Sequence, residues 1–274
     1  MTILAFCLVL AAALIHTSWN FWLKVSGDRL AAFATIGGGW AIVGTIAVAL
    51  LGAPDAAVWP YLLVSTVVHG VYAFALMKSY QLGNFSKAYP IARGIGPLVV
   101  ALASLIYLGE PLGITGVLGI VLIIAGAVWL GFPTSMPDFT SLMMSIATGV
   151  LIGTYTLLDG LGGRAGSSPH VFAAWLFLFT AIPVMAVALG VHRSRIIDVL
   201  RPIWVRGLAA GVMSAAAYWI VIWAMSEAHM GLVAALRESS VVFAALLGAI
   251  FLKERVRWLG VALVFAGIVF AKLA

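Results

Sequence analysis

Residues 88–110, AYPIARGIGPLVVALASLIYLGE, decide the fold, because residues 232–254, LVAALRESSVVFAALLGAIFLKE, repeat them in register without a gap. In each copy a glutamate follows an arginine by 17 positions: Arg93 and Glu110 in the first, Arg237 and Glu254 in the second. On a helix this spacing is about 25 Å at 1.5 Å per residue, nearly the hydrocarbon thickness of a bilayer. The repeat predicts a duplicated membrane protein, and duplicated spans are typical of transporters.

The composition places most of the chain in lipid. Of 274 residues, 64% are hydrophobic and only 9% are charged, whereas about a quarter of the residues of a soluble domain are charged. The net charge of +6 does not predict nucleic-acid binding, because the basic residues sit in short loops and form no stripe. Cys7 is the only cysteine, which excludes disulfides within the chain and cysteine-based metal sites. The first apolar run continues to Trp22, and we interpret it as a span, not a signal peptide.

Apolar runs of about 17 to 25 residues predict ten membrane helices. They cover approximately 3–23, 30–51, 59–80, 89–109, 113–131, 139–158, 170–190, 204–225, 232–252 and 257–273. Five helices then fall in residues 1–132 and five in residues 133–274. Because five is odd, the second repeat must enter the membrane in the opposite sense. The predicted fold is an all-α membrane protein of two inverted five-helix repeats around a central cavity.

Loop charges predict the orientation of the chain. Eleven basic residues fall on one side and only Arg164 and Lys272 on the other. The eleven are Lys24, Arg29, Lys78, Lys87, Arg193, Arg195, Arg201, Arg206, Lys253, Arg255 and Arg257. Since basic loops stay in the cytoplasm, we expect a multi-pass protein of the inner (plasma) membrane with both termini on the non-cytoplasmic side.

Several short motifs resemble the EamA-type family of the drug/metabolite transporter superfamily. They are His16-Thr17-Ser18-Trp19-Asn20 followed by Lys24, Tyr89-Pro90-Ile91-Ala92-Arg93-Gly94, Leu108-Gly109-Glu110-Pro111, the segment from Tyr155 to Arg164, and Arg237-Glu238-Ser239-Ser240. The resemblance covers nearly the whole chain. It implies a secondary transporter, commonly an exporter of amino acids or other small metabolites, with a cavity between the two halves. Many relatives carry basic termini, which this chain almost lacks, so the expected orientation follows its loop charges.

Glu238 is the one acidic residue expected well inside a span, where an ionised carboxylate is costly without a partner. We predict that it couples transport to protons. The alternative is a salt bridge between helices that only locks their packing. Arg237 is adjacent, but successive helical positions are about 100° apart, so the two side chains are expected to serve different partners.

Arg93 and Arg237 are the only basic residues expected well inside spans, and both are predicted to point into the cavity. A guanidinium binds a carboxylate with two hydrogen bonds, which suits an anionic substrate. Alternatively, each arginine braces curved backbone near Pro90 and Pro97, or pairs with Glu238. Two arginines also leave room for a phosphorylated substrate, although a dedicated phosphate carrier is expected to gather more cations.

Other polar and aromatic residues complete the predicted pocket. His16 and Asn20 share one helical face, as do His69 and Tyr72, and they are expected to bind substrate. His69 is also a second candidate for proton coupling, and helix packing is the alternative role for both histidines. The aromatic residues expected to wall the pocket, or else to fill the core, are Trp19, Tyr72, Tyr155, Tyr218 and Trp219. The dispersed histidines predict no metal site.

The sequence therefore predicts a secondary transporter that exports a small metabolite, most simply an amino acid or a derivative, by proton-coupled alternating access. An obligate exchanger of phosphorylated or nucleotide-linked metabolites is the alternative. A lipid-modifying enzyme is more remote, because the acids and histidines are dispersed. The chain has no nucleotide-binding loop. We expect no enzymatic activity and no cofactor. We expect a lipid bilayer and a small molecule as partners, no nucleic acid, and function as a monomer.

Two further features are assigned structural roles. Gly37-Gly38-Gly39 predicts close helix packing beside Trp40, and Glu110 and Glu254 are assigned structural roles at the ends of their spans.

Overall fold

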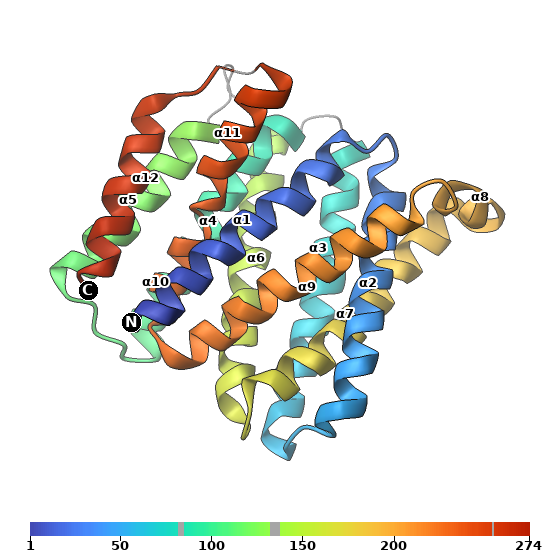
Figure 1. Ribbon diagram of the computed structural model, residues 1–274, viewed down its shortest axis with the longest axis horizontal. Coiled ribbons are helices and arrows are strands. Elements are labelled where there is room, and N and C mark those ends of the chain that lie inside the picture. Colours follow the sequence, from blue (N-terminus) through green and yellow to red (C-terminus); the bar gives the residue numbers. More distant parts are fainter. Residues whose placement is uncertain (82–84, 132–137, 254) are drawn as a thin grey trace.

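The computed structural model describes residues 1–81, 85–131, 138–253 and 255–274 (Figure 1). Side chains are described within these ranges except at 76–81, 85–90 and 252. The predictions that concern Glu254 and the segment from Pro133 to Pro137 lie outside the described residues. So do those on the side chains of Lys78, Lys87 and Pro90.

Every regular element in the described part of the chain is a helix. The elements are α1 (Ile3–Val25), α2 (Arg29–Leu51), η1 (Ala56–Val58), α3 (Trp59–Gln81), α4 (Phe85–Tyr107), α5 (Ile114–Gly131), α6 (Phe139–Ala165), α7 (Pro169–His192), η2 (Arg193–Arg195), α8 (Ile196–Leu200), α9 (Trp204–Glu227), α10 (Met230–Arg237), α11 (Ser240–Leu252) and α12 (Trp258–Lys272). Short polar side chains begin several of them by accepting a backbone N–H: Thr2 for α1, Asp28 for α2, Asp138 for α6 and Ser168 for α7.

Ten membrane crossings account for these helices. Among the described residues, eight segments are long and apolar enough to cross a membrane, and α12 and residues 91–107 of α4 are shorter apolar helices. The segment formed by α10 and α11 is one crossing, and α8 belongs to the connection between α7 and α9. The all-helical, multi-pass prediction is confirmed.

Two of the expected boundaries are wrong. The sixth span was expected to end at residue 158, with a loop from Gly160, but α6 continues to Ala165. Glycine is tolerated inside membrane helices, so Gly160, Gly162 and Gly163 do not end it. The segment from His192 to Pro202, expected to be a loop, contains η2 and α8.

The ninth span is also not the continuous helix that was expected. It is interrupted at Glu238 and Ser239, between α10 and α11. There the N–H groups of Glu238 and Ser239 donate to carbonyls three residues earlier, not four. The matched residues of the first copy lie inside α4, which is continuous through Arg93 and Pro97. The predicted irregular backbone is therefore at Arg237 and not at Arg93.

Helices from the two halves of the chain pack against one another (Figure 1). At the left of the view α5 lies beside α12, and at the right α2 packs on α7 and α9. In the middle α4 packs on α6, and α1 crosses in front against α9, α10 and α11. Both termini lie at the lower left. The interrupted crossing of α10 and α11 packs against α1, α4, α5, α6, α9 and α12.

Glycine permits the closest of these approaches. A Cβ at Gly39 would lie 2.7 Å from the Cα of Gly211 and 2.7 Å from the carbonyl oxygen of Leu208, both in the backbone of α9. The prediction that Gly37-Gly38-Gly39 serves helix packing is confirmed.

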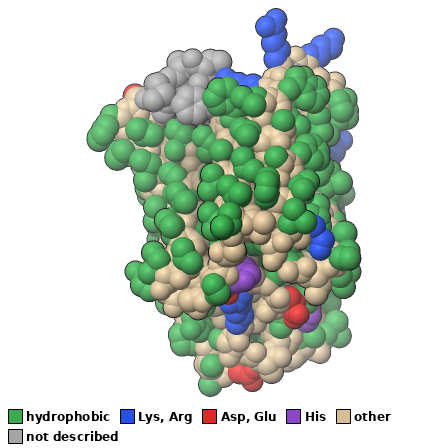
Figure 2. Space-filling model, turned by 90° about the vertical axis from the view of Figure 1, so that its left-hand side faces the viewer, with side chains coloured by type: hydrophobic (Ala, Val, Ile, Leu, Met, Phe, Trp, Pro, Cys, Tyr) green, Lys and Arg blue, Asp and Glu red, His purple; other side chains and the backbone are tan. Residues whose placement is uncertain are grey.

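The outer surface of the bundle is apolar. Figure 2 shows hydrophobic side chains spread over the middle of one face, with lysine and arginine side chains projecting at one end. Exposed leucine, isoleucine, valine and phenylalanine residues occur on most of the long helices. A surface of this kind is suited to lipid.

Candidate functional site

A cavity of about 480 Å³ lies in the middle of the bundle and reaches one of its ends. Its deep part is lined by mid-helix residues of α1, α3, α4, α6, α7 and α9 and by the start of α11. Its outer part is lined by Lys24 at the end of α1, Arg29 at the start of α2 and Gly131 at the end of α5. The cavity therefore opens at the end of the bundle where α1 and α5 finish.

Glu238 sits between the two duplicated arginines at the helix interruption. Its carboxylate is fully buried. Oε2 lies 2.9 Å from Nε of Arg93, and Oε1 lies 3.7 Å from Nε of Arg237. The side chains of Arg237 and Glu238 were expected to point toward different partners. This is wrong, because at the break in the helix the two charged groups lie within ion-pair distance of each other. Arg93 does pair with Glu238, which was one of the alternatives.

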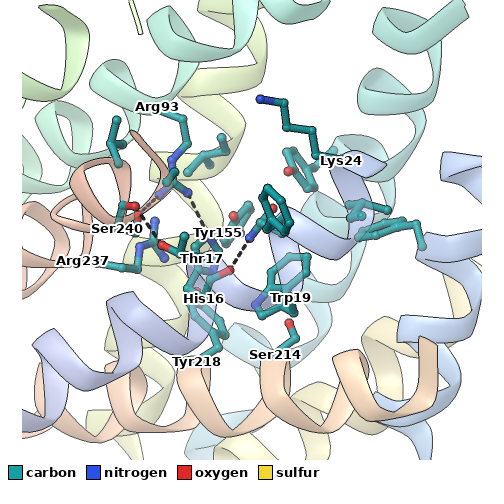
Figure 3. Close-up of a pocket in the computed structure, with 18 of the residues that line it drawn as sticks. His16, Thr17, Trp19, Lys24, Arg93, Tyr155, Ser214, Tyr218, Arg237 and Ser240 are labelled. Atoms are coloured by element: carbon teal, nitrogen blue, oxygen red, sulfur yellow. Dashed lines mark hydrogen bonds between the residues drawn. The ribbon is translucent and has the colours of Figure 1, made fainter. Parts of the chain in front are cut away.

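The arginine cluster is tied to α1. Arg93 donates from Nη2 to Oγ of Ser240 at 2.9 Å, and its Nη1 lies 3.3 Å from Nε2 of His16. The hydroxyl of Thr17 donates to the carbonyl of Ser240 at 2.8 Å, which holds the first turn of α11. Figure 3 shows Arg93, Arg237 and Ser240 grouped on one side of the cavity, with Lys24 apart from them.

A second buried carboxylate, Asp159, lies behind the cavity wall. It is fully buried in α6 and accepts hydrogen bonds from the hydroxyls of Ser65 and, at 2.7 Å, Tyr218. Nε2 of His69 lies 3.8 Å from it. Glu238 is therefore not the only acid inside a span. The sequence analysis missed Asp159 because the predicted sixth span stopped at residue 158, one residue before it.

Aromatic rings also line the cavity, some of them beside the arginines. The ring of Tyr155 lies 4.1 Å from that of His69, 5.5 Å from that of Tyr72 and 6.4 Å from that of Tyr218. The guanidinium carbon of Arg237 lies 5.8 Å from the centre of the Tyr218 ring, a cation–π distance. Trp19 meets the His16 ring edge-on at 5.0 Å.

The predicted binding residues can now be placed. The residues among them that line the cavity are His16, Trp19, Asn20, His69, Tyr72, Arg93, Tyr155, Tyr218 and Arg237. Trp219 does not line it: its ring stacks on Phe177 at 5.9 Å, and its N–H donates to Nδ1 of His170 at 2.8 Å. Because neighbours on a helix point about 100° apart, Tyr218 facing the cavity turns Trp219 away from it. Glu238 lies behind the arginines.

The sequence analysis also missed cavity residues that lie at helix ends or have small side chains. Lys24 and Arg29 were counted only as loop charges, and Ser214 and Ser240 were not singled out. Lys24 lies one turn beyond Asn20 and two beyond His16, so the helical periodicity of this face could have identified it. No comparable signal marks Ser214.

The opposite end of the bundle is closed by polar contacts. Glu110 pairs with Arg164, and its Oε2 accepts the N–H of Met230 at 3.1 Å, which caps α10. Arg164 donates to the carbonyls of Met225 and Ala228, each at 2.7 Å. Glu110, to which a structural role was assigned, therefore links α6 to the start of α10.

Comparisons with known proteins agree with this fold. Residues 139–273 match the EamA-like transporter family. A solved structure described only as "Crystal structure of protein" superposes with a TM-score of 0.79 at 19% identity, over 98% of this chain and 97% of that chain. At that identity the likeness shows the fold alone. No curated protein matches the chain in sequence. The chain belongs to the EamA-like transporter family, within the drug/metabolite transporter superfamily, and is a multi-pass membrane protein of that type.

Proposed function

We propose that the protein is a secondary active transporter that exports a small metabolite across the inner membrane by alternating access. The observation that carries the proposal is the cavity, which is polar at mid-depth and opens at one end of the bundle. At the other end Glu110 and Arg164 tie α6 and α10 together. A site accessible from one side at a time is what alternating access requires.

The arrangement of the helices supports two inverted repeats of five. The contact of α4 with α6 has its counterpart in that of α1 with α11, and that of α3 with α6 in that of α1 with α9. The contact of α2 with α9 likewise corresponds to that of α3 with α7. The contacts of α2 with α7 and of α5 with α12 each correspond to themselves when the two halves are exchanged. These are the pairs that an exchange of residues 1–132 with 133–274 generates. Rocking of one half against the other is the corresponding transport movement.

The lining favours an anionic substrate. Arg93 and Arg237 face the cavity at mid-depth, and the guanidinium group binds a carboxylate with paired hydrogen bonds. The aromatic residues that line the same cavity suit an apolar side chain. An amino acid or an amino-acid derivative fits both features.

Proton coupling is assigned to Glu238. Its carboxylate is buried within reach of the two arginines that would bind the substrate. Substrate and proton can influence each other there only if the substrate binds the two protonation states with different affinity. Competition for the same guanidinium groups supplies that difference.

Exchange of a phosphorylated or nucleotide-linked metabolite is the second candidate. It is favoured by Lys24 and Arg29, which join the two arginines in lining the cavity. The site therefore gathers more cations than the two that the sequence suggested. A phosphate group carries more charge than a carboxylate and would use them.

Proteoliposomes test the proposal. We would measure efflux of a labelled amino-acid panel with and without a proton gradient, for the wild type, for Glu238→Gln and for the control Glu227→Gln on the exposed end of α9. We expect gradient-dependent flux in the wild type and the control. In Glu238→Gln we expect loss of the gradient dependence with counterflow exchange retained. Flux of phosphorylated metabolites alone, in exchange mode only, would favour the second candidate, and no flux of either class contradicts transport.

A further inference from the structure

The charges that line the cavity are all of one sign. Among the described residues, the lining includes Lys24, Arg29, Arg93 and Arg237 but no carboxylate. The two acids nearby, Glu238 and Asp159, are fully buried and lie behind the lining. A substrate with an ammonium group would meet four permanent cations and no ionic acceptor. The electrostatics of the surface therefore select against that group.

Of the two deep arginines, Arg237 has a donor without an acceptor among the described residues. Arg237 is only 5% exposed, and its Nε has no hydrogen-bond acceptor among the described residues. Neither oxygen of Glu238 accepts a hydrogen bond from a described residue, although Nε of Arg93 is 2.9 Å away. Glu238 is thus held by charge without directed bonds. A carboxylate entering from the cavity could form the paired bonds that Glu238 does not.

The charge of the cluster sets the charge of that ligand. Arg93 and Arg237 with ionised Glu238 carry one net positive charge. If a ligand carboxylate binds the arginines while Glu238 takes up a proton, the buried cluster keeps the same net charge. Binding the anion beside ionised Glu238 would instead make two carboxylates share the same two guanidinium groups, which leaves fewer paired hydrogen bonds for each of them. The exchange of one negative charge for another suits a monoanion.

Resting on the proposed function, we infer that the ligand is an organic monocarboxylate with an aromatic or apolar body and no ammonium group, which displaces ionised Glu238 from Arg93 and Arg237 and is bound together with a proton. Tyr155 and Trp19 would pack against its body. Among the amino-acid derivatives proposed above, this ligand class contains those that have lost the amino group.

Other groups around Glu238 do not supply this proton. The segment of α10 and α11 packs against α1, α4, α5, α6, α9 and α12. From these helices the charged or titratable groups that face the cluster are His16, Arg93, Tyr218 and Asp159. Nε2 of His16 accepts from Arg93, which opposes its protonation. Asp159 bonds to the far side of Tyr218 and has no arginine within ion-pair distance among the described residues.

This mode of binding determines the direction in which ligand and proton cross the membrane relative to each other. Because binding of the anion and protonation of Glu238 favour each other, linkage makes their effects reciprocal. Ligand and proton then cross the membrane in the same direction. An outward proton gradient then drives export of the ligand, and an inward gradient opposes it.

Three ligands that differ only in their charged groups test the inference: 3-phenylpropionate, phenylalanine and 2-phenylethylamine. Binding to the purified full-length protein in nanodiscs would be measured by calorimetry at several pH values, in buffers of different ionisation enthalpy so that proton uptake is counted. We expect 3-phenylpropionate to bind with uptake of up to one proton. Its affinity should fall about tenfold per pH unit where Glu238 is ionised. Phenylalanine should bind at least about tenfold more weakly, a loss of about 1.4 kcal/mol, and the amine should not compete.

Glu238→Gln mimics the protonated acid and should bind 3-phenylpropionate without proton uptake or pH dependence. Glu227→Gln should behave as the wild type. If Glu238→Gln does not fold, the proton count of the wild type decides alone. Binding without proton uptake overturns the displacement, and tighter binding of phenylalanine, or no binding of 3-phenylpropionate, overturns the ligand class. Amino-acid flux in vesicles would then leave the proposed function standing. Proton-linked binding without any flux would instead contradict transport and leave the site assignment intact.

Discussion

At the scale of single residues, the two arginines of the internal repeat have different surroundings. Arg93 contacts His16, Ser240 and Glu238, whereas Arg237 lies over the Tyr218 ring and beside Glu238. The position that holds Glu238 in the second copy is Gly94 in the first. One acid therefore serves two guanidinium groups, and the asymmetry of the copies leaves a net positive charge at the site.

Replacing each arginine by lysine separates charge from shape. Arg93→Lys and Arg237→Lys keep the positive charge but lose the planar fork that bonds a carboxylate twice. We expect affinity for an anionic substrate to fall about 10- to 100-fold, or about 1.4–3 kcal/mol, with the protein still folded. Binding titrations and thermal unfolding check this. Arg206→Lys, at the exposed start of α9, is the control, and equal affinity in all three variants would contradict the assignment.

Asp159 is a second residue-scale feature with a positioning role. It accepts the hydroxyl of Tyr218, whose ring faces Arg237, so a buried acid outside the cavity helps to orient its wall. Hydrogen bonds to a buried charged group are worth about 1.5–3 kcal/mol each. The hydrogen bonds of Asp159 to Ser65 and Tyr218 therefore link α3, α6 and α9.

At the scale of helices, the interruption between α10 and α11 is the element that distinguishes the copies. Side chains from other helices hold it open: Thr17 bonds to the carbonyl of Ser240, and Arg93 to its hydroxyl. Free backbone groups inside a membrane need such partners. The matched stretch of α4 stays regular, with its backbone bonded within the helix.

Close packing of α2 on α9 leads to a stability prediction. A methyl group at Gly39 would meet the backbone of Leu208 and Gly211, which cannot move aside as a side chain can. We expect Gly39→Ala to lower the free energy of unfolding by about 1–3 kcal/mol. Gly190→Ala, in α7, has nothing within 4 Å of the added carbon and should be neutral or stabilising by up to about 1 kcal/mol. Denaturant titrations in detergent compare the two, and equal effects would contradict the packing argument.

The connection between α2 and α3 is fastened to that between α6 and α7 by a titratable contact. The backbone N–H of Ser167 donates to Oδ2 of Asp55 at 2.6 Å, and this bond lowers the pKa of Asp55. A carboxylate with a lowered folded pKa contributes stability above its unfolded pKa of about 3.9, and the contribution disappears as the pH falls through the folded value. We expect the difference in Tm between the wild type and Asp55→Ala to be constant above about pH 5 and to shrink below about pH 4.

Thermal unfolding at a series of pH values measures this difference. Asp198→Ala, on exposed α8, is the matched control and should change Tm little at any pH. A difference for Asp55→Ala that persists unchanged at about pH 3 would show that the carboxylate charge is not involved.

At the scale of the whole molecule, the two ends of the bundle differ. The cavity reaches the end where α1 and α5 finish, whereas at the other end Glu110, Arg164 and the N-terminus of α10 bond together. In the alternating-access cycle proposed above, opening on the second side would break these contacts. Their free energy therefore helps to set the balance between the two states of an alternating-access cycle.

Glu110→Gln tests the closed end. The amide keeps an acceptor for the N–H of Met230 but loses the charge that pairs with Arg164. We expect amide hydrogen exchange in residues 225–233 to become about three- to tenfold faster, which corresponds to about 0.7–1.4 kcal/mol. Exchange elsewhere should be unchanged. Glu227→Gln at the same end is the control, and unaltered exchange in Glu110→Gln would mean that the ion pair does not hold this end shut.

The sequence by itself determined the all-helical, multi-pass character of the chain and the presence of two arginines inside apolar helices, because apolar run length is a property of the chain read in order. It also identified nine of the polar and aromatic residues that line the cavity. Only the tertiary structure decided which groups meet: Glu238 with both arginines, and Asp159 with Ser65, His69 and Tyr218. Pairing of buried charges depends on helix rotation, on the exact ends of α6 and on the break before α11. These are set by packing between helices distant in the chain, which no local pattern encodes.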